Sequence, residues 1–311
     1  MNVPSPSSST AIISITALSR RFGSKQALDE VNLHVPRGCV FGLVGENGAG
    51  KTTLIKHILG LLKPQAGSVR VFGADPVADS VGVLGLIGYL SEQRDLPGWM
   101  RVDELLRYTR AFYPNWDPGY AEELRRQFGL DPAARVKNLS QGQQAKAGLA
   151  LALAFRPDLL LLDEPSSGLD PIVRRDILEA IIRTVADEGR TVFFSSHLLD
   201  EIERISDQIA MIRAGRIILS GRLDDLKKSH RQIRVRFEQA QATPPRFEFA
   251  LGLQGGGRDW TLLSTAEVSR VTAAAAAIGG RILGEETPSL DEIFVAHAAQ
   301  RPGSSEANSS L

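Results

Sequence analysis

An α/β fold built around a phosphate-binding loop is predicted from three features of this sequence. Residues 45–53 read Gly-Glu-Asn-Gly-Ala-Gly-Lys-Thr-Thr between an apolar run and a helical pattern, as in a phosphate-binding strand–loop–helix unit. Short apolar strands alternate with helical patterns over residues 159–219, which indicates a parallel sheet with helical crossovers. Residues 92–155 have helical spacing without a strand-like run, so we expect a helical subdomain inserted between strands.

The first ninety residues are predicted to be rich in strands. Residues 12–18 and 28–35 alternate between apolar and polar side chains, and residues 68–72 form a third such run after a turn. Residues 40–44 are wholly apolar apart from one glycine, as expected of a buried strand, and residues 51–59 show a helical pattern. The phosphate-binding loop therefore joins a buried strand to a helix.

Each residue type in the loop has a chemical reason to be there. Glycines at 45, 48 and 50 let the backbone curl so that successive N–H groups point at one anion. The helix N-terminus adds its positive dipole end. Lys51 provides a positive charge for the outer phosphates, and the Thr52 hydroxyl suits magnesium. The expected nucleotide-binding residues are Gly45, Glu46, Asn47, Gly48, Ala49, Gly50, Lys51, Thr52 and Thr53.

Composition limits the other classes of function. The chain has 311 residues with 36 Lys+Arg and 36 Asp+Glu, so it carries no overall basic charge and no nucleic-acid partner is expected. A single cysteine, Cys39, cannot form an internal disulfide, which suits a reducing compartment. No run reaches the ~18–20 apolar residues of a membrane span, and no secretory signal pattern is present. We therefore expect a cytoplasmic protein, and any membrane partner would be a separate chain.

Two acidic residues follow the apolar run of residues 159–162. Asp163 and Glu164 would lie at the carboxyl edge of a parallel sheet, beside the phosphate-binding loop. There Asp163 can hold magnesium, directly or through water, and Glu164 can align the attacking water. The alternative is an ordinary acidic strand end, which the loop upstream disfavours.

A second anion site is suggested about 90 residues after the loop. Ser140 precedes a helical pattern of small and apolar residues, so its hydroxyl would cap a helix whose N–H groups are exposed. The alternative interpretation is an ordinary helix cap without a ligand. The residues of this segment are Ser140, Gln141, Gly142 and Gln143.

These motifs together resemble the ATP-binding subunit of ATP-binding cassette (ABC) transporters. The resemblance spans residues 12–221 and includes the loop, the segment Leu-Ser-Gln-Gly-Gln at 139–143, and the run Leu-Leu-Leu-Leu-Asp-Glu-Pro at 159–165. Ser-Gly-Leu-Asp at 167–170 and the lone His197 complete it. It implies the P-loop NTPase core of the ABC type, in which two subunits pair head to tail. ATP would then lie between one subunit's loop and the other's 139–143 segment, which explains the second anion site.

The resemblance also implies roles for single residues. Phe22 would stack on adenine, although a strand-end core residue is the alternative. His197 would contact the γ-phosphate, where a capping or buried histidine is the alternative. Asp170 would communicate across the dimer, although Asp before a proline is also an ordinary helix start.

Two positions depart from the family pattern. Gln141 replaces the first glycine of the signature segment, while Ser140 and Gly142 remain, so phosphate contact is expected to persist. The glutamine expected to meet magnesium and water would follow residue 91, where the chain has Glu92 and then Gln93. Gln93 is assigned to that role, as a nucleotide and metal contact, with Glu92 as the open alternative.

The domain boundaries are predicted from changes in composition. We expect a disordered tail at residues 1–11 and an ATPase domain at 12–225, whose helical subdomain covers about 92–155. After a charged linker near residues 224–228, residues 231–299 are predicted to form a small α+β domain, followed by a flexible tail at 300–311.

The predicted function is ATP hydrolysis, with Mg²⁺, that drives transport through separate membrane permease subunits. The chain would be peripheral on the inner face of the membrane, as a homodimer or a heterodimer with a related ATPase subunit. The ending Leu-Asp-Glu-Ile-Phe at 290–294 resembles those of bacterial export-type ATPases and favours export. A non-transport ABC ATPase acting on ribosomes or DNA is the alternative, although such proteins commonly carry two cassettes or a long coiled coil.

Aromatic residues are concentrated near the predicted helical subdomain. All 4 Tyr and 2 of the 3 Trp lie between residues 89 and 120. Tyr108 and Phe112, four residues apart, are predicted to pack in the core. Trp99 lies in a Pro-Gly loop and is predicted to anchor a contact with another protein.

Overall fold

The computed structural model describes residues 11–186 and 189–299, which form two compact units. The first unit ends at Ser220 and the second begins at Gly221. The two predicted tails lie outside the described residues, except that Ala11 begins the first strand. Each unit is described by itself below.

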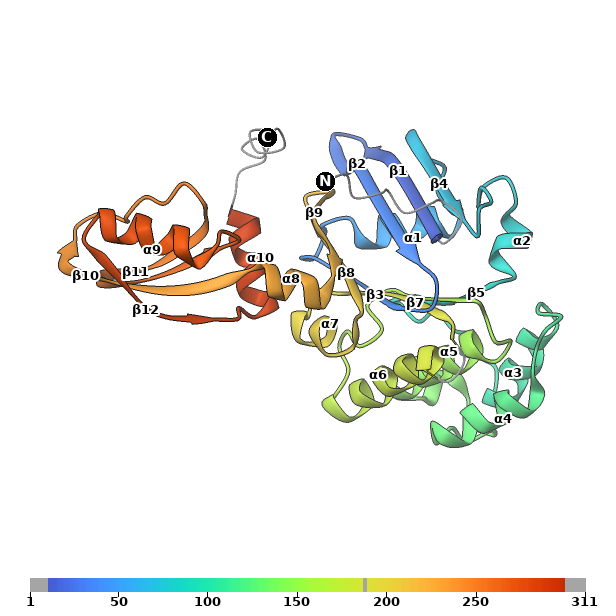
Figure 1. Ribbon diagram of the computed structural model, residues 1–311. Coiled ribbons are helices and arrows are strands. Elements are labelled where there is room, and N and C mark those ends of the chain that lie inside the picture. Colours follow the sequence, from blue (N-terminus) through green and yellow to red (C-terminus); the bar gives the residue numbers. More distant parts are fainter. Residues whose placement is uncertain (1–10, 187–188, 300–311) are drawn as a thin grey trace. The chain divides into compact units, whose positions relative to one another are not determined.

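A six-stranded sheet forms the centre of the first unit (Figure 1). Its order is β5-β6-β7-β3-β8-β9, and the strands from β5 to β8 run parallel to their neighbours. Strands β3, β6 and β7 are buried throughout, as is usual when both faces of a parallel sheet are covered. The strands are β3 (Val40–Val44), β5 (Ile87–Leu90), β6 (Leu159–Leu162), β7 (Thr191–Ser196), β8 (Gln208–Arg213) and β9 (Arg216–Arg222).

A separate antiparallel sheet contains the first strands of the chain. Its order is β2-β1-β4, with β1 at Ala11–Phe22, β2 at Lys25–Pro36 and β4 at Ala66–Val71. Helix α1 (Lys51–Ile58) packs between this sheet and the central one, because its apolar residues share one buried core with both. The strands predicted for the first ninety residues are thereby confirmed.

The helical subdomain is confirmed. It contains α3 (Val102–Arg110), α4 (Pro118–Gln127), a 3-10 turn (Val136–Asn138) and α5 (Gln141–Leu153). Its core includes Trp116 and Phe155, with the Tyr113 ring stacked on Phe155. The other helices of this unit are α2 (Ser80–Leu84), α6 (Pro171–Ala186) and α7 (Leu199–Ile205).

The prediction that Tyr108 and Phe112 pack in the core was wrong. Tyr108 is 51% exposed and Phe112 is 62% exposed. Their rings meet edge to face at 5.1 Å. Phe112 lies in the turn that continues α3, and a spacing of four residues brings two such side chains together whether or not anything covers them. Both rings therefore belong to the surface of the subdomain.

The second unit has its own three-stranded antiparallel sheet and core. The sheet has the order β11-β10-β12, with β10 at Arg231–Gln241, β11 at Ala250–Ser264 and β12 at Gly280–Glu286. Ile233, Val235 and Phe237 supply alternate inward positions of β10. Its helices are α8 (Leu223–Ser229), α9 (Val268–Ala277) and α10 (Leu290–Ala299).

The charged stretch predicted as a linker forms helix α8. Its first turn carries Asp224 and Asp225, and its last turn carries Lys227 and Lys228. Acidic residues near a helix N-terminus and basic residues near its C-terminus both stabilise the helix through its dipole.

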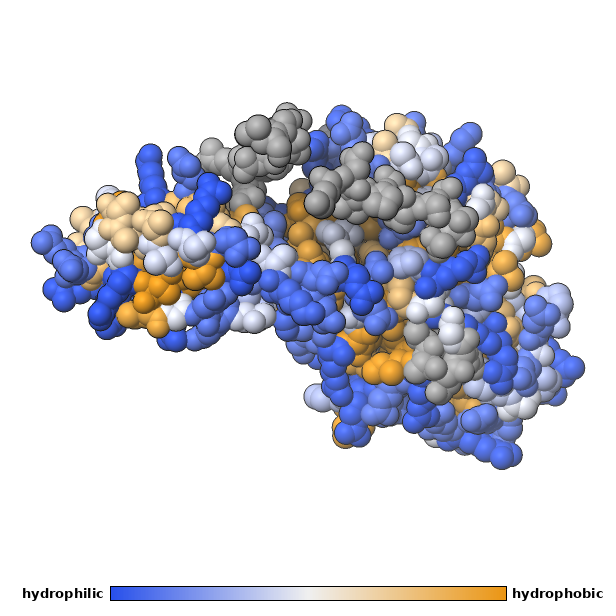
Figure 2. All heavy atoms as spheres, in the orientation of Figure 1, coloured by the Kyte–Doolittle hydropathy of each residue, from blue (hydrophilic) through white to orange (hydrophobic). Residues whose placement is uncertain are grey.

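A helix that spans a membrane needs both sufficient length and sufficient hydrophobicity. None of the helices that the structure describes combines the length and hydrophobicity needed to cross a bilayer. The visible face of the first unit carries mainly hydrophilic side chains, with hydrophobic ones in smaller patches (Figure 2).

Candidate active site

The phosphate-binding loop has the backbone geometry that its glycines allow. Gly48 and Gly50 have φ values of +80° and +117°, which side chains rarely tolerate. A Cβ atom on Gly45 would lie 2.3 Å from the Ile212 carbonyl oxygen, so the loop packs closely against β8. These constraints leave the backbone at the start of α1 curled around an open space.

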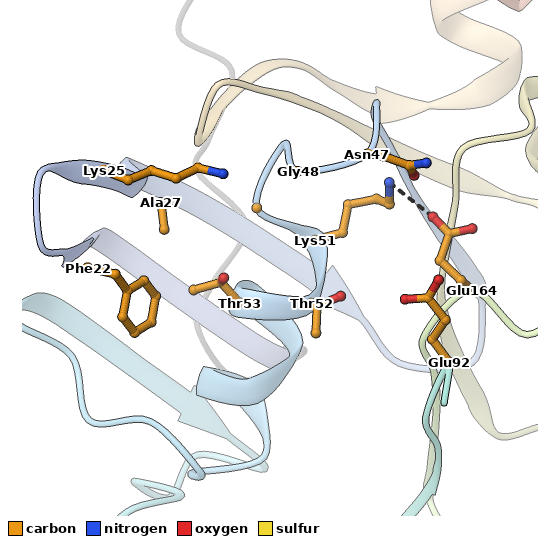
Figure 3. Close-up of a pocket in the computed structure, with 11 residues that line it drawn as sticks. Phe22, Lys25, Ala27, Asn47, Gly48, Lys51, Thr52, Thr53, Glu92 and Glu164 are labelled. Carbon is orange, nitrogen blue, oxygen red and sulfur yellow. Dashed lines mark ion pairs between the residues drawn. The ribbon is translucent and has the colours of Figure 1, made fainter. Parts of the chain in front are cut away.

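That space is a cavity of about 350 Å³, whose labelled side chains surround the loop in Figure 3. It is lined from three directions: by the loop and α1, by the β1–β2 hairpin, and by residues that follow β5 and β6. The lining residues are Phe22, Lys25, Ala27, Asn47, Gly48, Gly50, Lys51, Thr52, Thr53, Glu92 and Glu164. A predicted nucleotide loop and a predicted water-activating carboxylate thus share one cavity.

Lys51 is held at the centre of the loop. Lys51 is only 5% exposed. Its Nζ donates hydrogen bonds to the carbonyl oxygen of Gly45 at 2.5 Å and to that of Glu46 at 3.1 Å. The same Nζ forms an ion pair with Glu164 Oε1 at 3.0 Å. The ammonium group is therefore positioned by the loop and paired with the carboxylate across the cavity.

Asp163 and Glu164 follow β6, as predicted, and both are buried. Ser195, in the neighbouring strand β7, connects them: its Oγ donates to Asp163 Oδ1 at 2.8 Å and accepts from the Glu164 backbone N–H at 3.0 Å. Burial raises the pKa of Asp163, whereas hydrogen bonds from Ser195 and Thr52 act in the opposite direction. The structure thus brings the Thr52 hydroxyl and the Asp163 carboxylate together.

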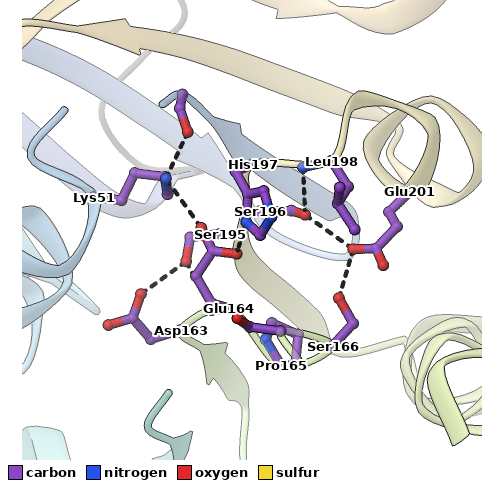
Figure 4. Close-up of polar contacts among 12 residues, drawn as sticks. Lys51, Asp163, Glu164, Pro165, Ser166, Ser195, Ser196, His197, Leu198 and Glu201 are labelled. Atoms are coloured by element: carbon purple, nitrogen blue, oxygen red, sulfur yellow. Dashed lines mark hydrogen bonds and ion pairs between the residues drawn. The ribbon is translucent and has the colours of Figure 1, made fainter. Parts of the chain in front are cut away.

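His197 contacts one oxygen of the Glu164 carboxylate. Its Nδ1 lies 2.7 Å from Glu164 Oε2, while Lys51 is paired with the other carboxylate oxygen (Figure 4). Glu164 itself has a φ of +48°, unusual for a residue with a side chain. The carboxylate is consequently fixed at both oxygens and directed at the loop.

Phe22 is a partly exposed ring at the rim of the cavity. It is 44% exposed, and the Arg20 guanidinium lies 4.7 Å from its ring centroid. An arginine over one face of an aromatic ring is favourable. Lys25, which the sequence analysis did not select, lines the same rim.

The predicted second anion site is not part of this cavity. Ser140 Oγ accepts from the Gln143 backbone N–H at 3.2 Å, and the Gln143 side chain accepts from the Ser140 N–H at 3.0 Å, which is a capping box at the start of α5. Gly142 packs against α6, since a Cβ there would lie 2.8 Å from Val173 Cγ2. None of residues 140–143 is among the described residues that line the cavity.

Two further assignments can be compared with the geometry. Glu92 lines the cavity, whereas Gln93 is exposed and is not among the described lining residues. Asp170 caps α6 by accepting from the backbone N–H groups of Ile172 and Val173 at 3.0 and 3.1 Å. The role of Gln93 as a nucleotide and metal contact and that of Asp170 in dimer communication remain predictions.

Ser195 and Glu201, like Lys25, are polar residues near the site that the sequence analysis missed. A weak signal existed, because Ser195 and Ser196 end an otherwise apolar strand and therefore lie at the same sheet edge as Asp163. Glu201 gave no comparable signal, since an acidic residue in a first helical turn is usually exposed.

Comparison with known proteins assigns the chain to one class. The family model described as "ABC transporter" matches residues 28–167. The chain is 33% identical to the bacitracin transport ATP-binding protein BcrA of Bacillus licheniformis, over 72% of this chain and 74% of that protein. It is 32% identical to the daunorubicin resistance ATP-binding protein DrrA3 of Streptomyces coeruleorubidus, over 91% and 94% of the two chains.

A solved ATP-binding subunit of an ABC transporter is 29% identical and superposes with a TM-score of 0.64, covering 70% of this chain and 92% of that one. The chain therefore belongs to the ATP-binding subunits of ABC transporters. It is the ATP-binding subunit that hydrolyses ATP to drive transport, and ABC ATPases of this kind dimerise and act with membrane permease subunits.

Proposed function

We propose that this chain hydrolyses Mg²⁺-bound ATP in the cavity beside the loop, with Lys51, Glu164 and His197 as the catalytic residues. The observation that supports this most strongly is the Glu164 carboxylate, held between Lys51 Nζ at 3.0 Å and His197 Nδ1 at 2.7 Å. A carboxylate fixed in this way beside a phosphate-binding loop can align water for attack on a phosphoryl group.

Magnesium fits the oxygen donors at the base of the cavity. Mg²⁺ prefers one or two protein oxygen ligands together with phosphate oxygens and water. Thr52 and Asp163 offer a hydroxyl and a carboxylate that already share a hydrogen bond. When held by these residues, the ion would supply positive charge that neutralises the negative charge developing on the phosphates.

ATP and Glu164 compete for the same lysine. Lys51 has the role of binding the outer phosphates, yet without them its charge is paired with Glu164. A triphosphate in the loop draws Nζ away from Oε1, so this oxygen becomes available to accept a proton from water. His197, at the other carboxylate oxygen, keeps Glu164 in place and lies near the site of attack.

Glu92, rather than Gln93, is proposed for the position that meets magnesium and water. Of these two residues, Glu92 is among the described residues that line the cavity and Gln93 is not. A carboxylate is a stronger magnesium ligand than an amide, so this position can bind the ion or its water shell.

Lys51→Ala is expected to weaken ATP binding by about 10-fold or more, because a charge-assisted contact with phosphate contributes about 1.5–3 kcal/mol. Titration of a fluorescent ATP analogue measures this effect. Lys56→Ala is the matched control, since Lys56 is an exposed lysine of the same helix. An unchanged binding curve for Lys51→Ala would place the phosphates elsewhere.

Export is the direction of transport that we propose. DrrA3, whose name refers to daunorubicin resistance, aligns with 91% of this chain, so the similarity extends into the second unit. Removal of a compound from the cell is the simplest transport reaction that confers resistance. Two copies of this chain, or one copy with a related ATPase, would act beneath separate permease subunits at the inner face of the membrane.

Exposed aromatic residues support a permease contact on the helical subdomain. Trp99 is 71% exposed in the loop that follows Glu92. Tyr108, on α3, and Phe112, in the turn after α3, are also exposed. Exposed aromatic side chains are typical anchors of protein interfaces. Trp99 is seven residues after Glu92, so a movement of Glu92 upon ATP binding would be passed to Trp99 through a short stretch of chain.

Trp99→Ala is expected to weaken assembly with the permease by about 10-fold or more, in the range of an interface anchor. Co-purification with the permease measures the loss, while basal ATPase activity of the isolated subunit should be retained. Leu283→Ala is the control, since Leu283 is an exposed apolar residue of the second unit. Wild-type assembly of the Trp99 variant would exclude this side chain from the contact.

A further inference from the structure

Glu201 is a buried carboxylate next to the active site but outside its cavity. It lies in the first turn of α7 and is 2% exposed. It is absent from the described residues that line the cavity. A buried carboxylate is unfavourable unless it is paired and hydrogen-bonded, so its partners indicate what it does.

The partners of Glu201 come from three different segments. Its Oε2 accepts hydrogen bonds from Ser166 Oγ at 2.7 Å and from Ser196 Oγ at 2.9 Å (Figure 4). Its Oε1 lies 3.2 Å from Arg174 Nε and forms an ion pair with it. One carboxylate thus joins the turn after β6, the end of β7 and the N-terminal part of α6.

Two of these segments carry a catalytic residue of the proposed site, and the third is the helix that Asp170 caps. Ser166 is two residues from Glu164, and Ser196 directly precedes His197. Ser196 Oγ also accepts from the Leu198 N–H at 3.0 Å, so the residues on both sides of His197 are tied to the Glu201 carboxylate. The Arg174 N–H donates to the Asp170 carbonyl oxygen at 3.0 Å. The three connections therefore reach Glu164, His197 and Asp170.

We propose that Glu201 is a positioning residue for ATP hydrolysis, which fixes His197, the turn after Glu164 and the start of α6 relative to one another. This inference rests on the proposed roles of Glu164 and His197. A carboxylate can accept from both serines and pair with Arg174 at once. An amide can keep the serine contacts, but its NH₂ group would face the guanidinium. A catalytic group displaced by about 1 Å can lose about 100-fold in rate.

Glu201→Gln in the full-length chain tests this role. We expect kcat for ATP hydrolysis to fall by about 10-fold or more, while the Kd for a fluorescent ATP analogue stays within about twofold, because Glu201 acts in the reaction and not in binding. Asp200→Asn is the matched control, since Asp200 is an exposed acidic residue of the same helical turn.

Ser196→Ala and Arg174→Gln each remove one partner, and they decide the question if Glu201→Gln fails to fold. Both should lower kcat with little change in Kd, and combining Arg174→Gln with Glu201→Gln should give less than the product of the two effects. The proposal is overturned if these variants match Asp200→Asn in kcat, or if kcat, affinity and Tm all fall together. Glu164→Gln is measured in parallel to separate a failure of the proposed function from a failure of the Glu201 proposal. Its turnover tests the role of Glu164, whatever the Glu201 variants do.

Discussion

Glu164→Gln is expected to lower steady-state ATP turnover by about 10²- to 10⁴-fold, the range associated with losing a positioned acid–base group. Glutamine has nearly the same shape but cannot accept a proton from water. The loop and Lys51 are unchanged by this substitution, so the phosphates keep their binding site. Turnover by the purified variant is the measurement.

ATP affinity of the same variant is expected to stay equal to that of the wild type or to increase. The wild-type Lys51 is paired with Glu164 at 3.0 Å, and ATP must displace that pairing. A neutral amide competes less for the lysine, so the ATP-bound dimer should accumulate and be visible by size-exclusion chromatography. Glu179→Gln, at an exposed position of α6, is the control. Near-normal hydrolysis by Glu164→Gln would remove Glu164 from the proposed mechanism.

The parts of the fold that depend on local sequence were predictable. The loop at residues 45–53 is specified by its own glycines and by the apolar strand before it, so its place between β3 and α1 follows without tertiary information. Asp163 and Glu164 were predictable for a related reason. Parallel strands bring their carboxyl ends to one edge, so residues after β6 must face the loop after β3.

The parts that depend on packing between distant segments were not predictable. Nothing in the residues around Glu201 indicates that it is buried, because its burial depends on hydroxyl groups 35 and 5 residues away. The surface position of Tyr108 and Phe112 could not be recognised either, since helical spacing shows which residues share a face but not whether that face is covered. The proposal of Glu92 rather than Gln93 also depends on which side chain lines the cavity, which no local pattern shows.

Ser140 is predicted to act on the ATP of the partner subunit. The structure shows it as a helix cap away from the cavity of its own chain, within the described residues. In a head-to-tail dimer the same exposed cap would face the partner's ATP. Ser140→Arg should therefore abolish turnover while leaving ATP binding by its own loop intact. Loss of the cap itself costs only about 1 kcal/mol, which a measurement of Tm would reveal.

Mixing Ser140→Arg with Lys51→Ala subunits should restore activity that neither variant has alone. In a mixed dimer, the intact loop of the Ser140→Arg chain meets the intact Ser140 of the Lys51→Ala chain, so one of the two sites is complete. With random pairing in a two-fold dimer, at most about one quarter of wild-type turnover should return. A mixture of Lys51→Ala with Glu164→Gln is the control and should stay inactive, because both defects lie on the loop side and every site keeps one of them. If cross-linking shows that Ser140→Arg/Lys51→Ala dimers form yet turnover does not recover, Ser140 does not complete the partner's site.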